Sequence, residues 1–299
     1  MVNPGLAHWR DAVERRLSLE DFGLMIAQPR FEEAARLFFA QSLSRRGRFP
    51  LFSRVLKDTR RVLYGFMVVY LHARDGITLA RIRQICEEMN LASPGRAAAI
   101  LVHMRMIGFV QPAPNQPNKR EKRYLPTAEL EGAIHAILRD DLRALSLVEP
   151  DAARAEQRLA DPEFFRHFVL RAGEGLFTMR HTLIGTTFFA ERDAGLGILY
   201  EIVLSAEAGD AFPPKGPLRM SIKDLARRHG VSRAHVFRLF RDAEKLGLLA
   251  RDPDSQVGTI GDETRTALTT MAATMFIGYA TCCEHALRAT RDRVPAAAS

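Results

Sequence analysis

Apolar residues recur three or four positions apart along most of the chain, which is the spacing that puts side chains on one face of a helix. Outside the two segments discussed next, this spacing is clearest in Arg30–Leu43, in the stretch that follows Asp161-Pro162, and in Thr264–Arg291. Phenylalanine and methionine dominate these stripes, as is typical of a buried core rather than of a cofactor site. The apolar run Met271–Cys283 is too short to cross a bilayer, so we expect a buried helix there.

A different pattern, two short helices separated by a tight turn, follows in the last third of the chain. Ser221 is a favourable N-cap for a helix over Ile222–His229, and Gly230 supplies the left-handed residue that ends it. Ser232 then caps a second helix that runs to about Lys245. The apolar stripe of this second helix consists of Val236, Leu239, Phe240, Ala243 and Leu246. The pattern predicts a helix-turn-helix.

A β-hairpin is expected directly after the second helix. Gly247 ends the helix, Leu248-Leu249 starts a strand, Asp252–Gly258 forms a turn, and Thr259-Ile260 returns. The whole segment therefore reads as a helix-turn-helix with a hairpin wing.

A second copy of this pattern lies upstream. Ser232 follows Ser93 by 139 residues, and Gly247 follows Gly108 by the same 139 residues. A helix over Leu79–Glu88 is expected to precede Ser93. Further upstream, Val62-Leu63-Tyr64 parallels Ile198-Leu199-Tyr200. We interpret the chain as two copies of one unit, each a preceding helix plus a winged helix.

The predicted fold is mainly α with small β-hairpin wings, in which two winged helix-turn-helix units are joined and flanked by helices. The expected division is an N-terminal helical region (1–55), a first winged helix (56–138), a linker with helices (139–195), a second winged helix (196–263), and a C-terminal helix with a tail (264–299). Within the third part, the stretch Arg139–Glu156 is expected to link the two halves, because it is polar and contains Pro150. Residues after Pro295 are expected to form a frayed tail.

The second copy resembles the winged helix-turn-helix of bacterial transcription regulators, particularly the MarR-like kind. The residues that carry the resemblance are Asp224-Leu225-Ala226, Gly230-Val231-Ser232-Arg233, Val236, Arg238, Leu246-Gly247-Leu248 and Arg251. The first copy is similar to the same family, since Tyr124-Leu125-Pro126-Thr127 stands where that family's strand leads into its next helix. Flanking helices form a dimer interface in that family, so the resemblance implies a homodimer or, with two copies in one chain, an internal pseudo-dimer.

Positive charge is concentrated in the second copy. The chain has a formal net charge of +8, and residues 219–251 alone contain nine basic and three acidic residues, a net +6. Residues 1–74, with 13 basic and seven acidic residues, carry a further +6. A concentrated basic surface attracts polyanions, and duplex DNA is the polyanion that a helix-turn-helix typically binds.

The residues expected to contact DNA follow from this arrangement, because a recognition helix enters the major groove by its N-terminal end. On the second recognition helix we expect base or phosphate contacts from Ser232, Arg233, Ala234, His235, Arg238 and Arg241. Contacts to the DNA backbone are expected from Lys223, Arg227, Arg228 and Arg251. Arginine can bind guanine O6 and N7 with two hydrogen bonds, which makes it the main candidate for reading sequence.

The first copy has a different distribution of charge. Its recognition helix, Ser93–Met106, offers Ser93 and Arg96 but has Ala99 where the second copy has Arg238. Its wing is long and basic, with Lys119, Arg120, Lys122 and Arg123. We expect the second copy to read sequence and the first to contact phosphates or the minor groove through its wing. The alternative is that the apolar helix of the first copy faces a protein.

Residue patterns for catalysis or metal binding are missing from the sequence. The three cysteines, Cys86, Cys282 and Cys283, have no zinc-site spacing, and the phosphate loop GxxxxGK[ST] and the HExxH motif are absent. We therefore predict no enzyme activity, no cofactor and no metal. Trp9-Arg10-Asp11 interrupts the region where a signal peptide would be apolar, so a cytoplasmic, nucleoid-associated protein is expected.

These observations favour a transcription regulator that binds double-stranded DNA in a sequence-specific way. Two alternatives fit the same pattern: a replication initiator or chromosome-organising protein, and a winged-helix module whose partner is a protein. Nothing in the sequence specifies a small-molecule effector.

Overall fold

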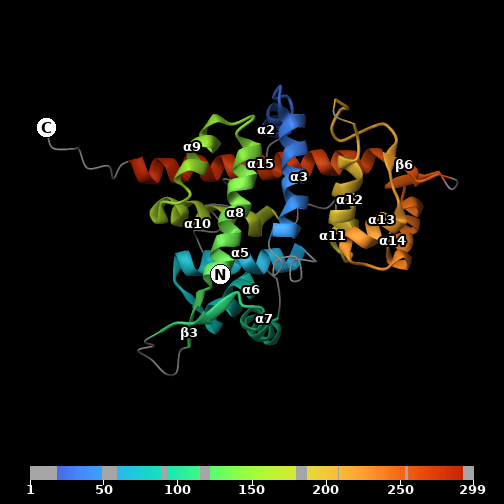
Figure 1. Ribbon diagram of the computed structural model, residues 1–299. Coiled ribbons are helices and arrows are strands. Elements are labelled where there is room, and N and C mark those ends of the chain that lie inside the picture. Colours follow the sequence, from blue (N-terminus) through green and yellow to red (C-terminus); the bar gives the residue numbers. More distant parts are fainter. Residues whose placement is uncertain are drawn as a thin grey trace.

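The computed structural model describes residues 19–48, 59–88, 93–114, 122–179, 187–207, 209–252 and 255–291. This part of the chain is mainly helical and contains two small antiparallel sheets, as the sequence predicts. The long helix α15 (Asp262–Arg291) extends through the molecule, and the helices α3 (Phe31–Arg48) and α8 (Ala128–Leu145) cross the direction of α15 (Figure 1).

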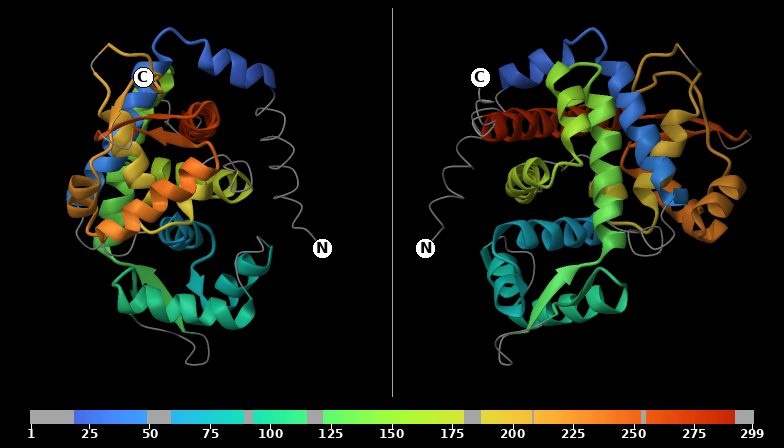
Figure 2. Two further views of the ribbon diagram at one scale, coloured as in Figure 1. Left: turned by 90° about the vertical axis from the view of Figure 1, so that its right-hand side faces the viewer. Right: turned by 60° about the vertical axis from the view of Figure 1, so that its left-hand side comes forward.

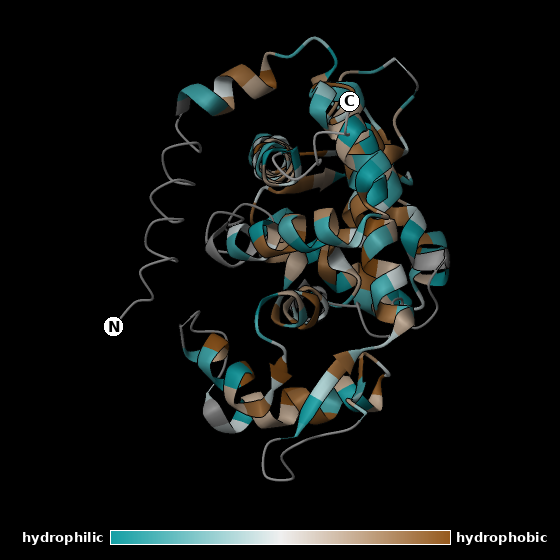
Figure 3. Ribbon diagram, turned by 90° about the vertical axis from the view of Figure 1, so that its left-hand side faces the viewer, coloured by the Kyte–Doolittle hydropathy of each residue, from teal (hydrophilic) through white to brown (hydrophobic). Residues whose placement is uncertain are grey.

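Six further helices belong to the helical body in the described part of the chain. They are α2 (Leu19–Ile26), α5 (Thr59–Arg74), α9 (Pro150–Arg158), α10 (Pro162–Met179), α11 (Thr187–Ala190) and α12 (Gly195–Leu204). Helix α10 packs along α15 and against α5, and α12 packs against α3. Hydrophobic and hydrophilic segments alternate along most of these helices, as expected for amphipathic helices that share one core (Figure 3).

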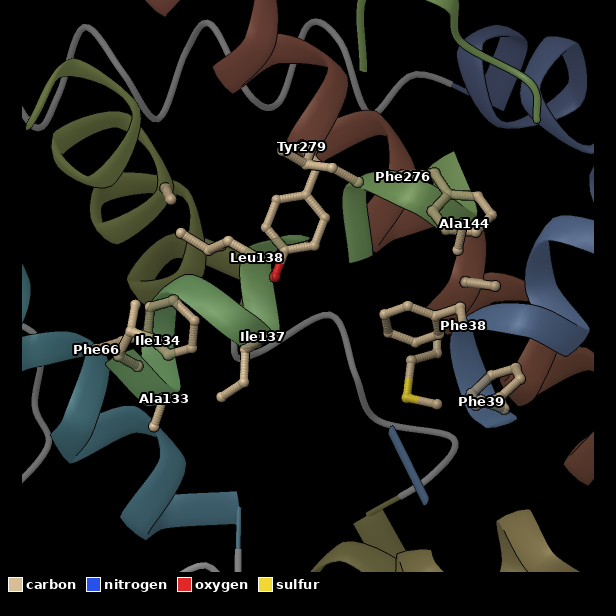
Figure 4. Packing of buried hydrophobic residues seen from close by; sticks show 14 of the residues in the cluster. Phe38, Phe39, Phe66, Ala133, Ile134, Ile137, Leu138, Ala144, Phe276 and Tyr279 are labelled. Carbon is tan, nitrogen blue, oxygen red and sulfur yellow. The ribbon is translucent and has the colours of Figure 1, made fainter. Parts of the chain in front are cut away.

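Aromatic side chains of α3 form the centre of the core. The rings of Phe31 and Phe38 both meet Phe276 of α15 edge to face, with centroid distances of 6.0 and 5.8 Å. Phe39 contacts Tyr200 of α12, with centroids 4.8 Å apart. Figure 4 shows Phe38, Phe39 and Phe276 together with buried residues of α8. The core therefore connects the N-terminal, central and C-terminal parts of the chain.

A buried polar cluster joins α3, α8 and α15. The guanidinium of Arg45 forms an ion pair with Asp141, and its Nε lies 3.4 Å from Oδ2 of Asp140. The hydroxyl of Tyr279 donates a hydrogen bond of 2.9 Å to Oδ2 of Asp141. Tyr279 extends from α15 toward α8 in Figure 4.

This cluster overturns one of our expectations. The stretch Arg139–Glu156 is not a linker, because it includes the end of α8 and most of α9, and Asp140 and Asp141 are buried. Its polar residues look solvent-exposed in the sequence, but their partner, Arg45, lies 96 residues away from Asp141.

Two units with the same order of elements flank the helical body. The first unit consists of β1 (Ile77–Thr78), α6 (Leu79–Glu88), α7 (Pro94–Met106), β2 (Val110–Pro112) and β3 (Arg123–Pro126). The second consists of β4 (Leu218–Arg219), α13 (Ile222–His229), α14 (Arg233–Lys245), β5 (Leu249–Arg251) and β6 (Val257–Ile260). They lie on different sides of the body, and the left view of Figure 2 shows the second unit facing the viewer with the first unit below.

The sheets of the two units have the same topology. Their strand orders are β1-β3-β2 and β4-β6-β5, and every pairing is antiparallel. The hairpins β2–β3 and β5–β6 confirm the predicted strands, whereas β1 and β4, two residues each, were not predicted. The residue directly before the helix that follows each hairpin makes the same kind of backbone hydrogen bond. Thr127 N donates to Phe109 O, and Gly261 N donates to Leu248 O.

Helix α15 is long and apolar enough to cross a membrane by length and composition alone. Here it packs against α10, α2 and α9, and more than half of its most apolar window, 56%, is buried inside the protein. A core helix with this composition passes the same test, and the packing agrees with the buried helix that the sequence predicts over Thr264–Arg291.

Candidate nucleic-acid interface

Local sequence signals determine the helix pair of the second unit. The hydroxyl of Ser221 accepts a hydrogen bond from Asp224 N at 3.4 Å, and that of Ser232 accepts one from His235 N at 3.1 Å. Between the two helices, Gly230 adopts the left-handed conformation with φ of 63°. A glycine pays no steric cost in that conformation, so the turn forms where the sequence predicts it.

Helix α13 is held against the preceding helix α12 by Glu201. One carboxylate oxygen of Glu201 lies 2.7 Å from Nε2 of His229, and the other pairs with Arg228. The His229 side chain is only 3% exposed. Arg228, expected to contact the DNA backbone, therefore also has a structural partner within the protein.

Helix α14 lies with one face in the core and the other toward solvent. Val236, Leu239, Phe240 and Ala243 are buried as predicted. Leu246 is 60% exposed and does not belong to the buried stripe, because the helix ends at Lys245 and Leu246 is the C-cap residue. The outer face therefore presents Arg233, Ala234, Phe237, Arg238, Arg241 and Lys245.

Part of the positive charge of the second unit has no ion-pair partner among the described residues. Five basic residues of the segment 219–251 are exposed and form no ion pair with any residue that the structure describes: Arg219, Lys223, Arg233, Arg238 and Lys245. Two of them, Arg233 and Arg238, are among the predicted base-contacting residues, and Lys223 is a predicted backbone contact. Ser232 is exposed as well, although its hydroxyl caps the helix.

Other predicted contact residues have partners inside the protein. Arg227 pairs with Asp224 at 3.1 Å, and Arg241 pairs with its neighbour Asp242 at 3.0 Å. Nε2 of His235 donates a hydrogen bond of 2.8 Å to the carbonyl oxygen of Asp193. The ring of His235 therefore helps to fix the start of α14 to the loop before α12.

Arg251 has several contacts within the protein. Its guanidinium makes two hydrogen bonds, of 2.8 and 2.9 Å, to the carboxylate of Glu244. It also lies 5.8 and 5.1 Å from the ring centroids of Phe237 and Phe240. The Arg251 side chain thus connects β5 to α14. Any contact of Arg251 with DNA would be additional to this structural role.

The corresponding helix of the first unit is different. Ser93 is its N-cap but makes no side-chain capping bond, and Arg96 is exposed. At the four positions that match Ala234, Arg238, Arg241 and Lys245 by the offset of 139, α7 has Gly95, Ala99, Val102 and Met106. Val102 is 53% exposed and Met106 is 80% exposed. The outer face of α7 is apolar where that of α14 is basic.

The basic wing of the first unit is described only in part. Lys122 and Arg123 are exposed at the start of β3. Lys119 and Arg120 lie outside the described residues.

Sequence reasoning missed two residues of the α14 face. Phe237 is 50% exposed beside the arginines, and Lys245 is exposed at the end of the helix. The signal was available, since Phe237 follows Ala234 by three positions and precedes Arg241 by four, which places all three on one side of a helix.

The described residues also bear on metal binding and on thiol reactivity. Among them, no group of three or more histidine, cysteine, aspartate or glutamate side chains could hold a metal ion. All three cysteines are buried, and burial raises the pKa of Cys282 to about 12, so that thiol stays protonated and unreactive. The comparisons with known protein families, curated proteins and solved structures found no match to this chain.

Proposed function

We propose that this protein binds double-stranded DNA through the outer face of α14 and acts as a transcription regulator. In this interpretation the two units are winged helix-turn-helix units of the MarR-like kind, and α14 is the helix that enters the major groove. The hairpins β2–β3 and β5–β6 are the wings. Three-stranded sheets of identical order next to a capped helix pair support this interpretation.

The observation that carries the proposal is the unneutralised charge on a rigidly held helix. Arg233 and Arg238 are exposed on α14 without an ion pair to a described residue, while the opposite face of the helix is buried in the core. Glu201 and Arg251 fix α13 and β5 on either side of it. A cationic helix face that does not need to reorganise is suited to phosphates and guanine edges.

The two units have different roles in this proposal. The second unit reads sequence, and the first contacts phosphates or the minor groove through Lys119, Arg120, Lys122 and Arg123. The apolar outer face of α7 favours a second candidate role for the first unit, contact with a protein, because Val102 and Met106 offer no hydrogen bonds to bases.

Equilibrium binding across a range of salt concentrations tests the proposal. The full chain is mixed with a pool of duplexes, and bound sequences are selected and their Kd values measured. If all five unpaired cations contacted phosphates, the slope of log K against log salt concentration would reach about −4.5, since each contact contributes about −0.9. Binding that is absent, or that does not change with salt, would refute the proposal.

The biological context needs a separate measurement. A map of bound sites in the source organism is expected to show promoters. Repeats clustered at one origin would favour the replication initiator instead, and a co-purifying protein together with no DNA footprint would favour the interaction module.

A further inference from the structure

An exposed phenylalanine is an unusual component of an otherwise basic helix face. Phe237 is 50% exposed on α14, and its neighbours along that side are Ala234, one turn before it, and Arg238 and Arg241. Single exposed apolar residues are common on protein surfaces and need no explanation by themselves. The residues around Phe237 and the residue at the matching position of the first unit distinguish it from such a case.

The phenyl ring of Phe237 lies near a guanidinium that is hydrogen-bonded within the protein. The guanidinium of Arg251 lies 5.8 Å from its centroid and is itself held by two hydrogen bonds to Glu244. A phenylalanine side chain has only two rotatable bonds, so a ligand that covers its ring orders fewer torsions than one that covers a long, flexible side chain.

The fold does not require an aromatic residue at this position. The residue of the first unit that matches Phe237 by the offset of 139 is Ala98, and α7 there forms the same helix with the same strand after it. The core of the second unit is filled by other side chains, among them Phe240, which is fully buried. What Phe237 adds is apolar surface on the outer side of the helix.

We propose that Phe237, together with Ala234, contacts the methyl group of a thymine in the major groove. This inference rests on the proposed function, because it needs α14 to lie in that groove. The thymine C5-methyl is the apolar group that a base pair displays on its major-groove edge, and alanine and phenylalanine side chains contact it. Arg238, one position after Phe237, would then read a neighbouring base, so a thymine next to an arginine-read guanine is the expected element of the site.

Replacement of thymine by uracil tests the contact, because it removes only the methyl group. Each thymine of the selected duplex is replaced in turn, and Kd is measured for the full-length wild-type protein and for Phe237→Ala. Burial of one methyl-sized group contributes about 0.8 kcal/mol, which corresponds to about a fourfold change in Kd. The wild type is expected to lose about fourfold at one or two positions, and Phe237→Ala is expected to lose nothing further there.

Two controls accompany the measurement. Phe237→Leu keeps an apolar side chain and should remain sensitive to uracil, and thermal unfolding checks that each variant is folded. A wild type that is indifferent to every replacement, or a Phe237→Ala variant that is as sensitive as the wild type, overturns the thymine contact while the DNA-binding proposal stands. Absence of any salt-sensitive duplex binding refutes the proposed function, and this inference with it.

Discussion

The buried hydrogen bond between Tyr279 and Asp141 should make a measurable contribution to stability. Substitution Tyr279→Phe removes one oxygen atom and leaves the aromatic ring in place, so no cavity forms around it. Asp141 then loses a donor in a site where its own side chain is only 2% exposed. Arg45 is then the remaining partner of the Asp141 carboxylate among the described side chains, and Arg45 also contacts Asp140.

The size of the effect follows from the charge of the acceptor. A hydrogen bond to a charged group is worth about 1.5–3 kcal/mol, so we expect Tyr279→Phe to lower the free energy of unfolding by about 2 kcal/mol. Unfolding entropy is about 2.1 cal/mol/K per residue, or about 0.6 kcal/mol/K for a chain of 299 residues. The corresponding decrease in Tm is about 3 °C if the chain unfolds in one transition.

Urea unfolding measured by circular dichroism provides the assay, and Tyr124→Phe provides the matched control. The hydroxyl of Tyr124 has no hydrogen-bond partner among the described residues, although its ring, 7% exposed, lies near Arg105. Its loss should change the unfolding free energy by less than about 0.5 kcal/mol. Asp141→Ala removes the closer carboxylate partner of the Arg45 guanidinium and leaves it only the longer contact to Asp140 among the described side chains, so it should cost about 3–5 kcal/mol.

The reasoning is wrong if Tyr279→Phe and Tyr124→Phe are equally stable. It is also wrong if Asp141→Ala costs no more than Tyr279→Phe, because the ion pair would then contribute nothing beyond the hydrogen bond.

Three further predictions concern the second unit and the pH dependence. Gly230→Ala should destabilise the protein by about 1–2 kcal/mol in urea unfolding, because φ of 63° is unfavourable for alanine even though no atom lies near the new methyl group. Glu201→Ala should cost about 1–3 kcal/mol and weaken duplex binding, because it removes the carboxylate that contacts both the buried His229 side chain and Arg228; unchanged Kd and stability would contradict this. His135 stacks on Phe165, with ring centroids 3.8 Å apart, and burial, with a smaller effect of Arg139, lowers its pKa below 6.5. The unfolded chain then takes up the proton first, so this contribution to stability is fully present above about pH 6.5 and is lost as the pH falls from there through the lower pKa of the folded protein; His135→Phe should lose less stability than the wild type between pH 7.5 and 5.5.

Local signals made much of the second unit predictable. The bounds of α13 and the start of α14 follow from Ser221, Gly230 and Ser232, because capping and left-handed turns depend only on residues a few positions apart. The same holds for α7, where proline follows Ser93. Strands β1 and β4 escaped prediction since two residues contain no periodicity, and they are strands only because β3 and β6 pair with them.

Partners distant in sequence explain the remaining errors and omissions. Asp140 and Asp141 look like solvent-exposed linker residues until Arg45 is brought next to them by α3. The arginines of the second unit look equivalent in the sequence, yet Arg228 and Arg251 have carboxylate partners and Arg238 has none among the described residues. Sequence could therefore identify the basic face but could not rank its residues.

Under the proposed function, the contrast between α7 and α14 implies different roles for the two units. Helices of matching position carry Val102 and Met106 in one unit and Arg241 and Lys245 in the other. We therefore do not expect a DNA site with two equal half-sites that are contacted in the same way. The DNA site should contain one half-site of specific sequence next to a stretch where the sequence matters less.

The most direct test of the account is the base preference of Arg238→Ala on the selected duplex. We expect specific binding to weaken by about 1–3 kcal/mol, with loss of discrimination at one base pair, where the wild type prefers guanine. Arg288→Ala removes the same charge from α15, where Arg288 pairs with Glu284 and its side chain is 75% exposed, and should leave Kd and base preference unchanged. If both variants bind every duplex as the wild type does, the outer face of α14 is not a DNA-reading surface.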